Sequence, residues 1–287
     1  MRLGVVGDVH LCFDETDVEQ LDAEGYDAIL FVGDLAAYSH RGGLTVAQTI
    51  ARLGTPTFVM PGNHDAAHVG QLAAEVFEAD LLIPLMNLGQ DARRSELSDA
   101  LGPARLVGYS RHRLDAAGRS VDVIAARPHS AGGAHLAFRP HLRERFGIED
   151  FESSARRMAR LVDESDADEL IFLAHNGPTG LGSRRDDIWG CDFKSAEEDF
   201  GDPDLERAVE HAKRSGRRVR AVVAGHMHHE LRGGGQRRWR VREDGVLYVN
   251  AARVPRVFER DGRTLRHHVE LCVDDVAVHA REVLRRS

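Results

Sequence analysis

The sequence contains only three cysteines, Cys12, Cys191 and Cys272. They are odd in number and far apart, and none belongs to a C-x-x-C pair, so they indicate neither a disulfide framework nor a thiolate zinc site. A reducing cytoplasm is therefore the compartment we expect for this protein.

Long apolar runs are also missing, since no stretch approaches the length that spans a bilayer. The first residues, "MRLGVVGDVH", begin a strand at once and lack the segments of a signal peptide. We expect a soluble protein without a membrane partner. The formal net charge of −8 provides no overall basic field for a nucleic-acid backbone, so no nucleic-acid partner is expected either.

With 287 residues, of which 42% are hydrophobic, the chain is long enough to bury a substantial core. We expect one domain over residues 1–287. Short apolar runs bounded by Gly, Asp or Pro, such as "AILFVGD" and "VRAVVAGH", predict buried strands. Apolar residues at three- and four-residue spacing predict helices over residues 18–24, 44–53, 66–77, 151–164 and 205–214.

Strand and helix alternate in the N-terminal half, which is typical of parallel strands joined by crossover helices. The C-terminal half is richer in strands, which predicts a second sheet packed on the first. The polar segments 90–100, 176–190 and 233–238 are expected to be surface loops, and the middle one is long enough to be functional.

Polar clusters follow the predicted strands at the points where these strands end. Open α/β sheets place their sites at the carboxyl ends of strands, so residues remote in sequence should meet there. Taken singly, each motif could be an ordinary turn or a chance pair of residues. Only their order along the chain and their common position at strand ends indicate a site. The clusters are "GDVH" with Asp8 and His10, "VGD" with Asp34, "PGNHD" with Asn63, His64 and Asp65, "AHNGP" with His175, and "GHMH" with His226 and His228.

Carboxylate, amide oxygen and imidazole without thiolate suit a hard or borderline divalent ion such as Mn, Fe or Zn. The number of candidate ligands exceeds what one tetrahedral zinc needs, so two divalent metal ions are expected. A glycine precedes Asp34, Asn63 and His226, which would let the backbone turn sharply at each of them. Strand-like alternation would place His226 and His228 on the same side, one toward each ion.

The ordered set D-x-H, G-D, G-N-H-D, H and G-H-x-H resembles the calcineurin-like metallophosphoesterase superfamily over residues 8–228. This resemblance implies an α/β fold, a four-layer αββα sandwich of two mixed β-sheets flanked by helices. It also implies a hydrolase of phosphate esters with a metal-bridging hydroxide as nucleophile. On the matching positions it assigns Asp8, His10 and His228 to one metal, Asn63, His175 and His226 to the other, Asp34 to both, and His64 to a second-sphere catalytic role as acid or charge stabiliser.

The segments "AARPHSAGG", "LAHNGPTGLGS", "GDPDL" and "YVNAARVPR" look like a branch of this superfamily found in cyanobacteria and plant chloroplasts. One departure concerns the protein serine/threonine phosphatases, which carry G-D-x-V-D-R-G where this chain reads "GDLAAYS". The aspartate that orients the catalytic histidine and the phosphate-binding arginine are absent there, so a protein phosphatase is disfavoured. Asp65 could orient an imidazole instead, or bond a backbone amide at the start of the following helix.

Residues around the predicted centre have both functional and structural interpretations. His129, with Arg127 and Ser130 beside it, and Asn176 follow predicted strands and are candidate substrate contacts, with a structural turn as the alternative. His229 is expected to be exposed or to lie behind the metal ligands, and His267 and His268 to alternate between solvent and core. The arginines at 237, 238, 240 and 242 predict a solvated hairpin.

The leading hypothesis is a phosphatase or phosphodiesterase that acts on a small phosphorylated substrate. The sequence leaves open whether the ester is a monoester or a diester, what the 66–174 segment contributes to specificity, and the oligomeric state. A nuclease on the same metal core is the second hypothesis, although no aromatic-and-basic strand-binding stretch is evident. The third is a non-catalytic metal-binding interaction scaffold, which the complete set of candidate ligands disfavours.

Overall fold

The computed structural model describes residues 1–79 and 81–286, which form two mixed β-sheets. In the first sheet β1, β2, β3 and β4 run parallel, and β12 pairs antiparallel with β1, β11 and β13. Its strand order is β11 (Val257–Arg260), β12 (Arg263–Val273), β1 (Arg2–Val6), β2 (Ala28–Phe31), β3 (Thr57–Val59) and β4 (Arg105–Leu106), with β13 (Val278–Arg286) on β12.

The second sheet has a parallel centre formed by β6, β7, β8 and β10, and antiparallel strands at both edges. Its β7 supplies the predicted strand before His175, and its β8 the strand before His226. The strand order is β5 (Ser110–Ala116), β6 (Arg119–Ala125), β7 (Glu169–Leu173), β8 (Arg218–Ala224), β10 (Val246–Asn250) and β9 (Arg240–Glu243).

The two sheets pack face to face, and alternation along the strands divides their side chains between layers. In β2, Leu30 joins the core between the sheets, whereas its neighbour Phe31 faces the helices outside. In β7, Ile171 and Phe172 divide in the same way between the two layers. Nearly every residue of these central strands is apolar because both faces are covered.

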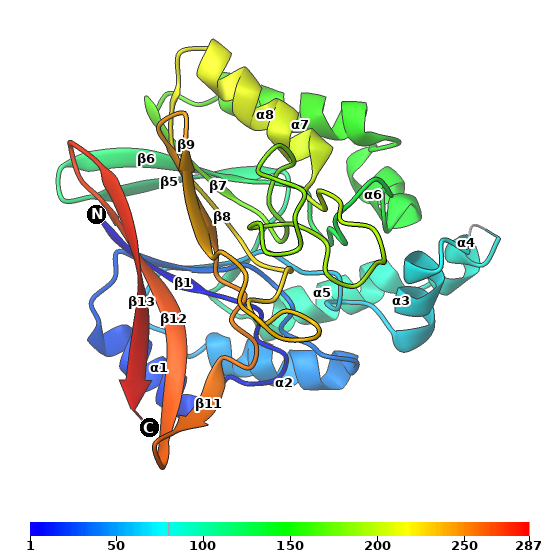
Figure 1. Cartoon of the computed structure of the whole chain (residues 1–287), viewed down its shortest axis with the longest axis horizontal. Coiled ribbons are helices and arrows are strands. Elements are labelled where there is room, and N and C mark those ends of the chain that lie inside the picture. Colours follow the sequence, from blue (N-terminus) through cyan, green and yellow to red (C-terminus); the bar gives the residue numbers. More distant parts are fainter. Residues whose placement is uncertain (80, 287) are drawn as a thin grey trace.

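Helices cover the outer face of each sheet, so the chain forms four layers, as Figure 1 shows. The expected αββα sandwich is confirmed. The helices α1 (Glu15–Ala23), α2 (His40–Ile50) and α5 (Gln90–Ala100) pack on the first sheet, and α7 (Phe151–Asp163) and α8 (Pro203–Arg214) pack on the second. The remaining helices, α3 (Val69–Val76), α4 (Ile83–Met86) and α6 (Arg139–Phe146), lie toward one end of the molecule (Figure 1).

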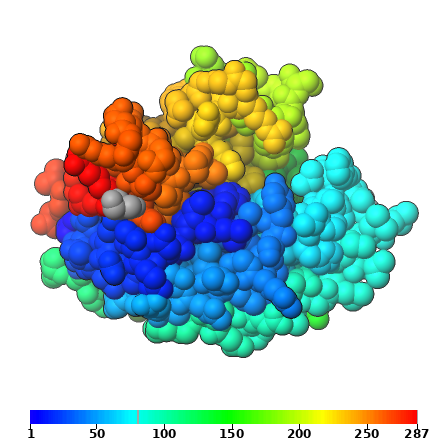
Figure 2. All heavy atoms as spheres, turned by 90° about the horizontal axis from the view of Figure 1, so that it is seen from below, coloured from blue at the N-terminus to red at the C-terminus, as the bar shows by residue number. Residues whose placement is uncertain are grey.

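Residues 69–79 and 81–88, which contain α3 and α4, project from the body of the protein (Figure 2). Several large apolar side chains of this projection face solvent, including Val76, Phe77, Leu85 and Leu88. None of the helices in the described part of the chain has the length and apolarity that crossing a bilayer requires.

Three expectations from the sequence are wrong. Residues 90–100 form the helix α5 and not a loop, and only Gln90 and Leu97 of this helix are buried, so the apolar periodicity that reveals a helix is absent. His267 and His268 are both buried because partners cover both faces of β12: His267 lies 3.1 Å from Glu282, and His268 lies 2.8 Å from the hydroxyl of Tyr26. Within the predicted hairpin, the arginine at position 237 is buried and not solvated.

Candidate metal centre

The strands β1, β2 and β3 of one sheet and β7 and β8 of the other end beside the same cluster of polar side chains. Six of the predicted metal ligands form two groups, and within each group the candidate ligand atoms lie within 4.8 Å of one another. The groups are Asp8, His10 and His228, and Asp34, His175 and His226.

The first group joins the ends of β1 and β8. Nε2 of His228 lies 3.5 Å from Oδ2 of Asp8 and 3.3 Å from Nε2 of His10. Asp8 is buried, whereas 43% of the His228 side chain is exposed. The cluster therefore opens to solvent on the side of His228.

The second group is deeper. Nε2 of His175 lies 3.5 Å from Oδ1 of Asp34 and 3.0 Å from Oδ1 of Asn63, which adds the seventh predicted ligand to this group. The ring of His226 lies 5.1 Å from that of His175. Its own Nε2 donates a hydrogen bond to the carbonyl of Ala131 at 3.0 Å, so Nδ1 is the ring nitrogen left for another partner.

Asp34 lies between the two groups and presents one carboxylate oxygen to each. Oδ1 faces His175, and Oδ2 lies 3.8 Å from Nε2 of His10. Nδ1 of His175 donates to the carbonyl of Val32 at 2.7 Å, so its Nε2 lone pair points toward the carboxylate and the amide oxygen of Asn63. A backbone acceptor of this kind fixes the tautomer and the orientation of an imidazole.

His64 lies at the exposed edge of this arrangement. Its backbone amide donates to Oδ1 of Asp34 at 2.9 Å, and its Nδ1 donates to the carbonyl of Ala37. Its half-buried ring packs between His10 at 5.3 Å and the exposed ring of Tyr38 at 5.2 Å. The carbonyl of Ala37 thus does what the aspartate absent from "GDLAAYS" would do, and it leaves Nε2 as the outward ring nitrogen.

The backbone at the candidate ligands is unusual. His10, Asp34 and His226 have positive φ angles of 42°, 49° and 67°, in the left-handed region that few residues other than glycine adopt. His226 therefore lies in a turn after β8, and the expected strand-like alternation of His226 and His228 is wrong, although both rings still enter the cluster. At Gly62 a Cβ atom would lie 2.2 Å from Oδ1 of Asp34, so glycine is needed there for close approach.

Burial and the neighbouring charges shift the pKa values of the candidate ligands, in some cases in opposite directions. Burial alone would raise the pKa of Asp8, but the hydrogen bond from His228 and the charge of His175 outweigh it and hold the pKa below its usual range. Burial would lower the pKa of His175, yet Asp34 and Asp8 raise it. Burial lowers the pKa of His226 to about 3. Burial would raise the pKa of Asp34 as well, but the charge of His175 outweighs it, so that this pKa is lowered too. The buried carboxylates of Asp8 and Asp34 thus stay ionised at neutral pH and require cationic partners.

Asp65 links the loops of Asp34 and Asn63. Its carboxylate accepts hydrogen bonds from the backbone amides of Ala36 at 3.0 Å and Gly62 at 2.9 Å. Of the two roles considered for this residue, bonding to backbone amides is the one observed, but the amides belong to these loops and not to the following helix. Burial and the nearby Asp34 raise the pKa of Asp65 to about 6.

The candidate substrate residues lie behind the cluster. His129 is fully buried, and its Nδ1 donates to the carbonyl of Gly62 at 2.9 Å. Asn176 is fully buried as well, and its amide donates to the carbonyl of Phe200 at 2.8 Å. These contacts favour support of the surrounding loops, and a contact of either residue with substrate stays a prediction. Arg127 is also buried and forms ion pairs with two aspartates, so the structure does not place it at an open surface.

Sequence reasoning missed the role of Arg237. Its buried guanidinium donates through Nε to the carbonyl of His228 at 3.0 Å and through Nη1 to the carbonyl of Asp187 at 2.9 Å, and Nη2 lies 3.1 Å from Asp192. His229, behind His228, is buried and bonds the carbonyl of Asn250 at 2.8 Å. In the sequence these residues look like part of a polar surface stretch, so only their distant partners reveal them.

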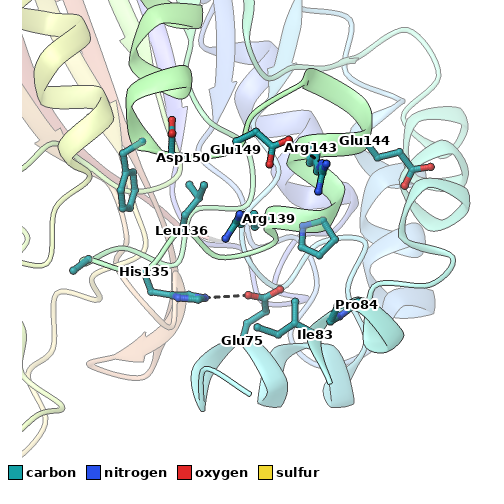
Figure 3. Close-up of a pocket in the computed structure, with 13 residues that line it drawn as sticks. Glu75, Ile83, Pro84, His135, Leu136, Arg139, Arg143, Glu144, Glu149 and Asp150 are labelled. Atoms are coloured by element: carbon teal, nitrogen blue, oxygen red, sulfur yellow. Dashed lines mark hydrogen bonds and ion pairs between the residues drawn. The ribbon is translucent and has the colours of Figure 1, made fainter. Parts of the chain in front are cut away.

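A cavity of about 910 Å³ lies between the α3–α4 projection and the starts of α6 and α7 (Figure 3). Ile83, Leu136 and Phe151 supply apolar walls, and Arg139 lies among them. Four further charged residues of its lining pair with one another, so the cavity by itself does not specify one class of ligand. These pairs are His135 with Glu75 at 3.4 Å and Arg143 with Glu149 at 2.8 Å.

Comparison with known proteins gives a family match over most of the chain. Solved structures with a similar arrangement include a dimetal phosphatase from Danio rerio (12% identity, 98% of each chain covered, TM-score 0.49). A metallophosphoesterase from Sphaerobacter thermophilus has 13% identity over all of this chain and 88% of the other, with a TM-score of 0.35. No significant match to a curated protein is found. The model of the calcineurin-like phosphoesterase family matches residues 1–230, and the chain therefore belongs to that family.

Proposed function

We propose that this protein hydrolyses esters of phosphate with two divalent metal ions, and that Mn, Fe or Zn fits the site. The observation that carries this proposal is the position of Asp34, whose two carboxylate oxygens face two separate groups of ligand atoms. Buried carboxylates, imidazoles and an amide oxygen without thiolate are a donor set that suits these ions. One ion would be held by Asp8, His10 and His228, and the other by Asn63, His175 and His226, with Asp34 shared by both.

When bound, such ions polarise phosphoryl oxygens and lower the pKa of water. The chain's own residues contribute orientation. The carbonyls of Val32 and Ala131 each take one ring N–H, from His175 and His226 respectively, so the other nitrogen of each ring faces the centre. This arrangement keeps the ligand geometry in place before any ion arrives, which lowers the cost of assembling the site.

We assign the proton-handling role to His64. With Nδ1 held on the carbonyl of Ala37, its Nε2 faces outward beside His10, where it can hold a proton for the leaving alkoxide or stabilise charge on the phosphoryl group. The amide bond to Asp34 ties the root of this side chain to the centre. His64 would therefore act beside the candidate ligands without itself holding an ion.

The substrate we propose is a small phosphorylated molecule, acted on in the cytoplasm, with no nucleic acid or membrane as partner. Turnover of p-nitrophenyl phosphate and of bis-p-nitrophenyl phosphate, each with added Mn²⁺, tests the class of ester. A preference for the first indicates a phosphatase, and a preference for the second a phosphodiesterase. No turnover of either with Mn²⁺, Fe²⁺ or Zn²⁺ would contradict the proposal.

The nuclease alternative is tested by incubation with single-stranded and duplex DNA, and cleavage at rates above those for the small esters would favour it. The scaffold alternative is tested by His64→Ala, because a non-catalytic metal-binding protein has no turnover to lose. The net charge of −8 and the outward position of His64 support the small-molecule hydrolase over both alternatives.

We also propose that residues 1–287 act as one domain, since β12 near the C-terminal end pairs directly with β1. Membership of the cyanobacterial and chloroplast-type branch is a further proposal. The segments that suggested it contribute buried contacts behind the centre, among them His129, Asn176 and Asn250. Whether relatives that share the four segments cluster together in a family tree tests this assignment.

A further inference from the structure

The loop that follows β6, residues 127–132, lies against two parts of the proposed metal centre. The backbone amide of His129 donates to the carbonyl of Pro61 at 2.9 Å, and its Nδ1 donates to the carbonyl of Gly62, next to Asn63. Two residues later, the carbonyl of Ala131 accepts the Nε2–H of His226 at 3.0 Å. The position of this loop therefore affects two candidate ligands.

Ser130 anchors the loop beside Ala131. Its hydroxyl donates to Oδ1 of Asp202 at 2.7 Å and accepts the amide N–H of Gly132 at 3.1 Å. The peptide that presents the Ala131 carbonyl is thus held through its own N–H, that of Gly132, by a hydroxyl that Asp202 fixes in turn. Ser130 is fully buried, so water does not compete for these bonds.

Asp202 connects Ser130 to the loop that carries His175. Its backbone amide donates to the carbonyl of Gly177 at 2.7 Å, and its Oδ1 lies 3.4 Å from the side-chain amide of Asn176, the residue after His175. The guanidinium of Arg127 holds the same Oδ1 at 2.8 Å. One carboxylate oxygen therefore borders both the loop that carries His175 and the 127–132 loop that orients His226.

We propose that Ser130, acting through Asp202, is a positioning residue that sets the affinity of the His175–His226 group for its divalent ion. The inference rests on the proposed two-metal function. Ser130 touches neither ion nor substrate; it fixes the acceptor that orients the His226 ring. Loss of such outer partners of a metal-bound histidine weakens metal binding by about 10–100-fold.

Ser154 of α7 provides a matched control. It is fully buried like Ser130, and its hydroxyl donates to Asp204, the other aspartate that pairs with Arg127. Ser154→Ala removes the same kind of hydrogen bond from the charged network around Arg127, but it removes no bond to Ser130, Ala131 or Gly132 and none to the loop of His175. A purely structural effect should therefore be equal in the two variants.

The experiment titrates the metal-free full-length protein with Mn²⁺ by calorimetry, and with Co²⁺ while recording its visible absorption. The wild type should bind two equivalents. Ser130→Ala should raise the Kd of one equivalent about tenfold, leave the other unchanged and alter the Co²⁺ spectrum of the weakened site. Ser154→Ala should reproduce both wild-type equivalents and the wild-type spectrum. Equal affinities in the two variants would overturn the inference.

If Ser130→Ala does not fold, the same titration compares Asp202→Asn with Asp204→Asn. Each change removes one negative charge beside Arg127, and only the first should weaken one equivalent. Should the wild type bind no Mn²⁺ or Co²⁺, the proposed function fails and this inference fails with it. Should the wild type bind two equivalents while both members of each pair behave alike, the inference alone fails.

Discussion

The backbone amide of His64 donates a hydrogen bond of 2.9 Å to Oδ1 of Asp34. The residue proposed to handle protons is thereby joined to the carboxylate proposed to lie between the ions. This bond is independent of the imidazole, so it survives changes to the His64 side chain. Substitutions at the two positions should therefore have separable effects, one on metal content and the other on turnover.

Asp34→Asn should abolish binding of at least one of the two ions. The asparagine side chain keeps the size of the aspartate and an acceptor for the backbone N–H of His64. It removes the negative charge that faces His175 on one side and His10 on the other. We expect the affinity for Mn²⁺ to fall by about 100-fold or more, since loss of outer partners alone costs 10–100-fold. Metal analysis after dialysis measures the stoichiometry. Asp122→Asn, at a buried carboxylate within the second sheet, is the control and should keep both ions.

His64→Ala should keep two ions and lose turnover. Removal of a positioned acid or base lowers kcat by about 10²–10⁴-fold, and no candidate ligand atom is changed. Steady-state kinetics together with metal analysis checks both parts. His68→Ala removes the side chain that caps the first turn of α3 and should affect stability more than turnover. Equal loss of turnover in the two variants would argue against a specific role for His64.

The affinity for Mn²⁺ should rise with pH until the pH passes the folded pKa values of His175 and His228, which lie above the usual imidazole value, and should then level off. Burial would lower the pKa of both His175 and His228, but Asp34 and Asp8 raise the pKa of His175, and Asp8 raises that of His228. Both rings must therefore release protons before they bind an ion. The stability that the two protonated rings add to the metal-free protein is present below 6.5 and is lost as the pH rises through their folded pKa values. His226, with a pKa of about 3, is neutral throughout this range and releases none.

Calorimetric titrations in buffers of different ionisation enthalpy count these protons, and thermal unfolding with and without Mn²⁺ follows the stability. The gap between the two unfolding temperatures should widen with pH. A gap and an affinity that do not change between pH 6 and 8 would contradict the raised pKa values of His175 and His228.

Arg237→Met should destabilise the fold. The change leaves Asp192 without its buried partner and several backbone carbonyls without a donor, and breaking a buried ion pair of this kind costs about 3–5 kcal/mol. Urea unfolding measures the loss. Arg238→Met is the matched control, because that side chain is 55% exposed and its pair with Asp187 should contribute less than about 1 kcal/mol. Similar losses in both variants would show that burial of Arg237 is not the cause.

The sequence predicts the clustering of candidate ligands well, and the reason is geometric. Parallel strands bring their carboxyl ends to one edge of each sheet, and the packing of the two sheets brings these edges together. The motifs "GDVH" after β1 and "GHMH" after β8, more than two hundred residues apart, therefore meet at the distances found between His10 and His228. The strand-rich C-terminal half predicts the second sheet, whereas the four-layer arrangement is what the resemblance to the metallophosphoesterase superfamily implies.

The surrounding residues could not be predicted because their partners carry no signature. The acceptors that orient His64, His175 and His226 are backbone carbonyls, which every residue possesses. In the sequence Arg127 and Arg237 resemble surface arginines, because the aspartates that pair with them belong to other loops. The helix α5 could not be predicted from apolar periodicity, because Leu97 is its one buried apolar side chain.

The left-handed backbone at His10, Asp34 and His226 restricts how this centre can change. Aspartate and histidine tolerate that conformation better than most side chains, whereas other residues with a Cβ incur about 1–2 kcal/mol at each position. A change of one of these residues to cysteine or glutamate would be the direct way to alter which metal the site prefers. Such a change would destabilise the protein because of the left-handed backbone at that position. Selection for a new metal preference should act instead on the neighbours that tilt each ring, and lineages of this protein should diverge there first.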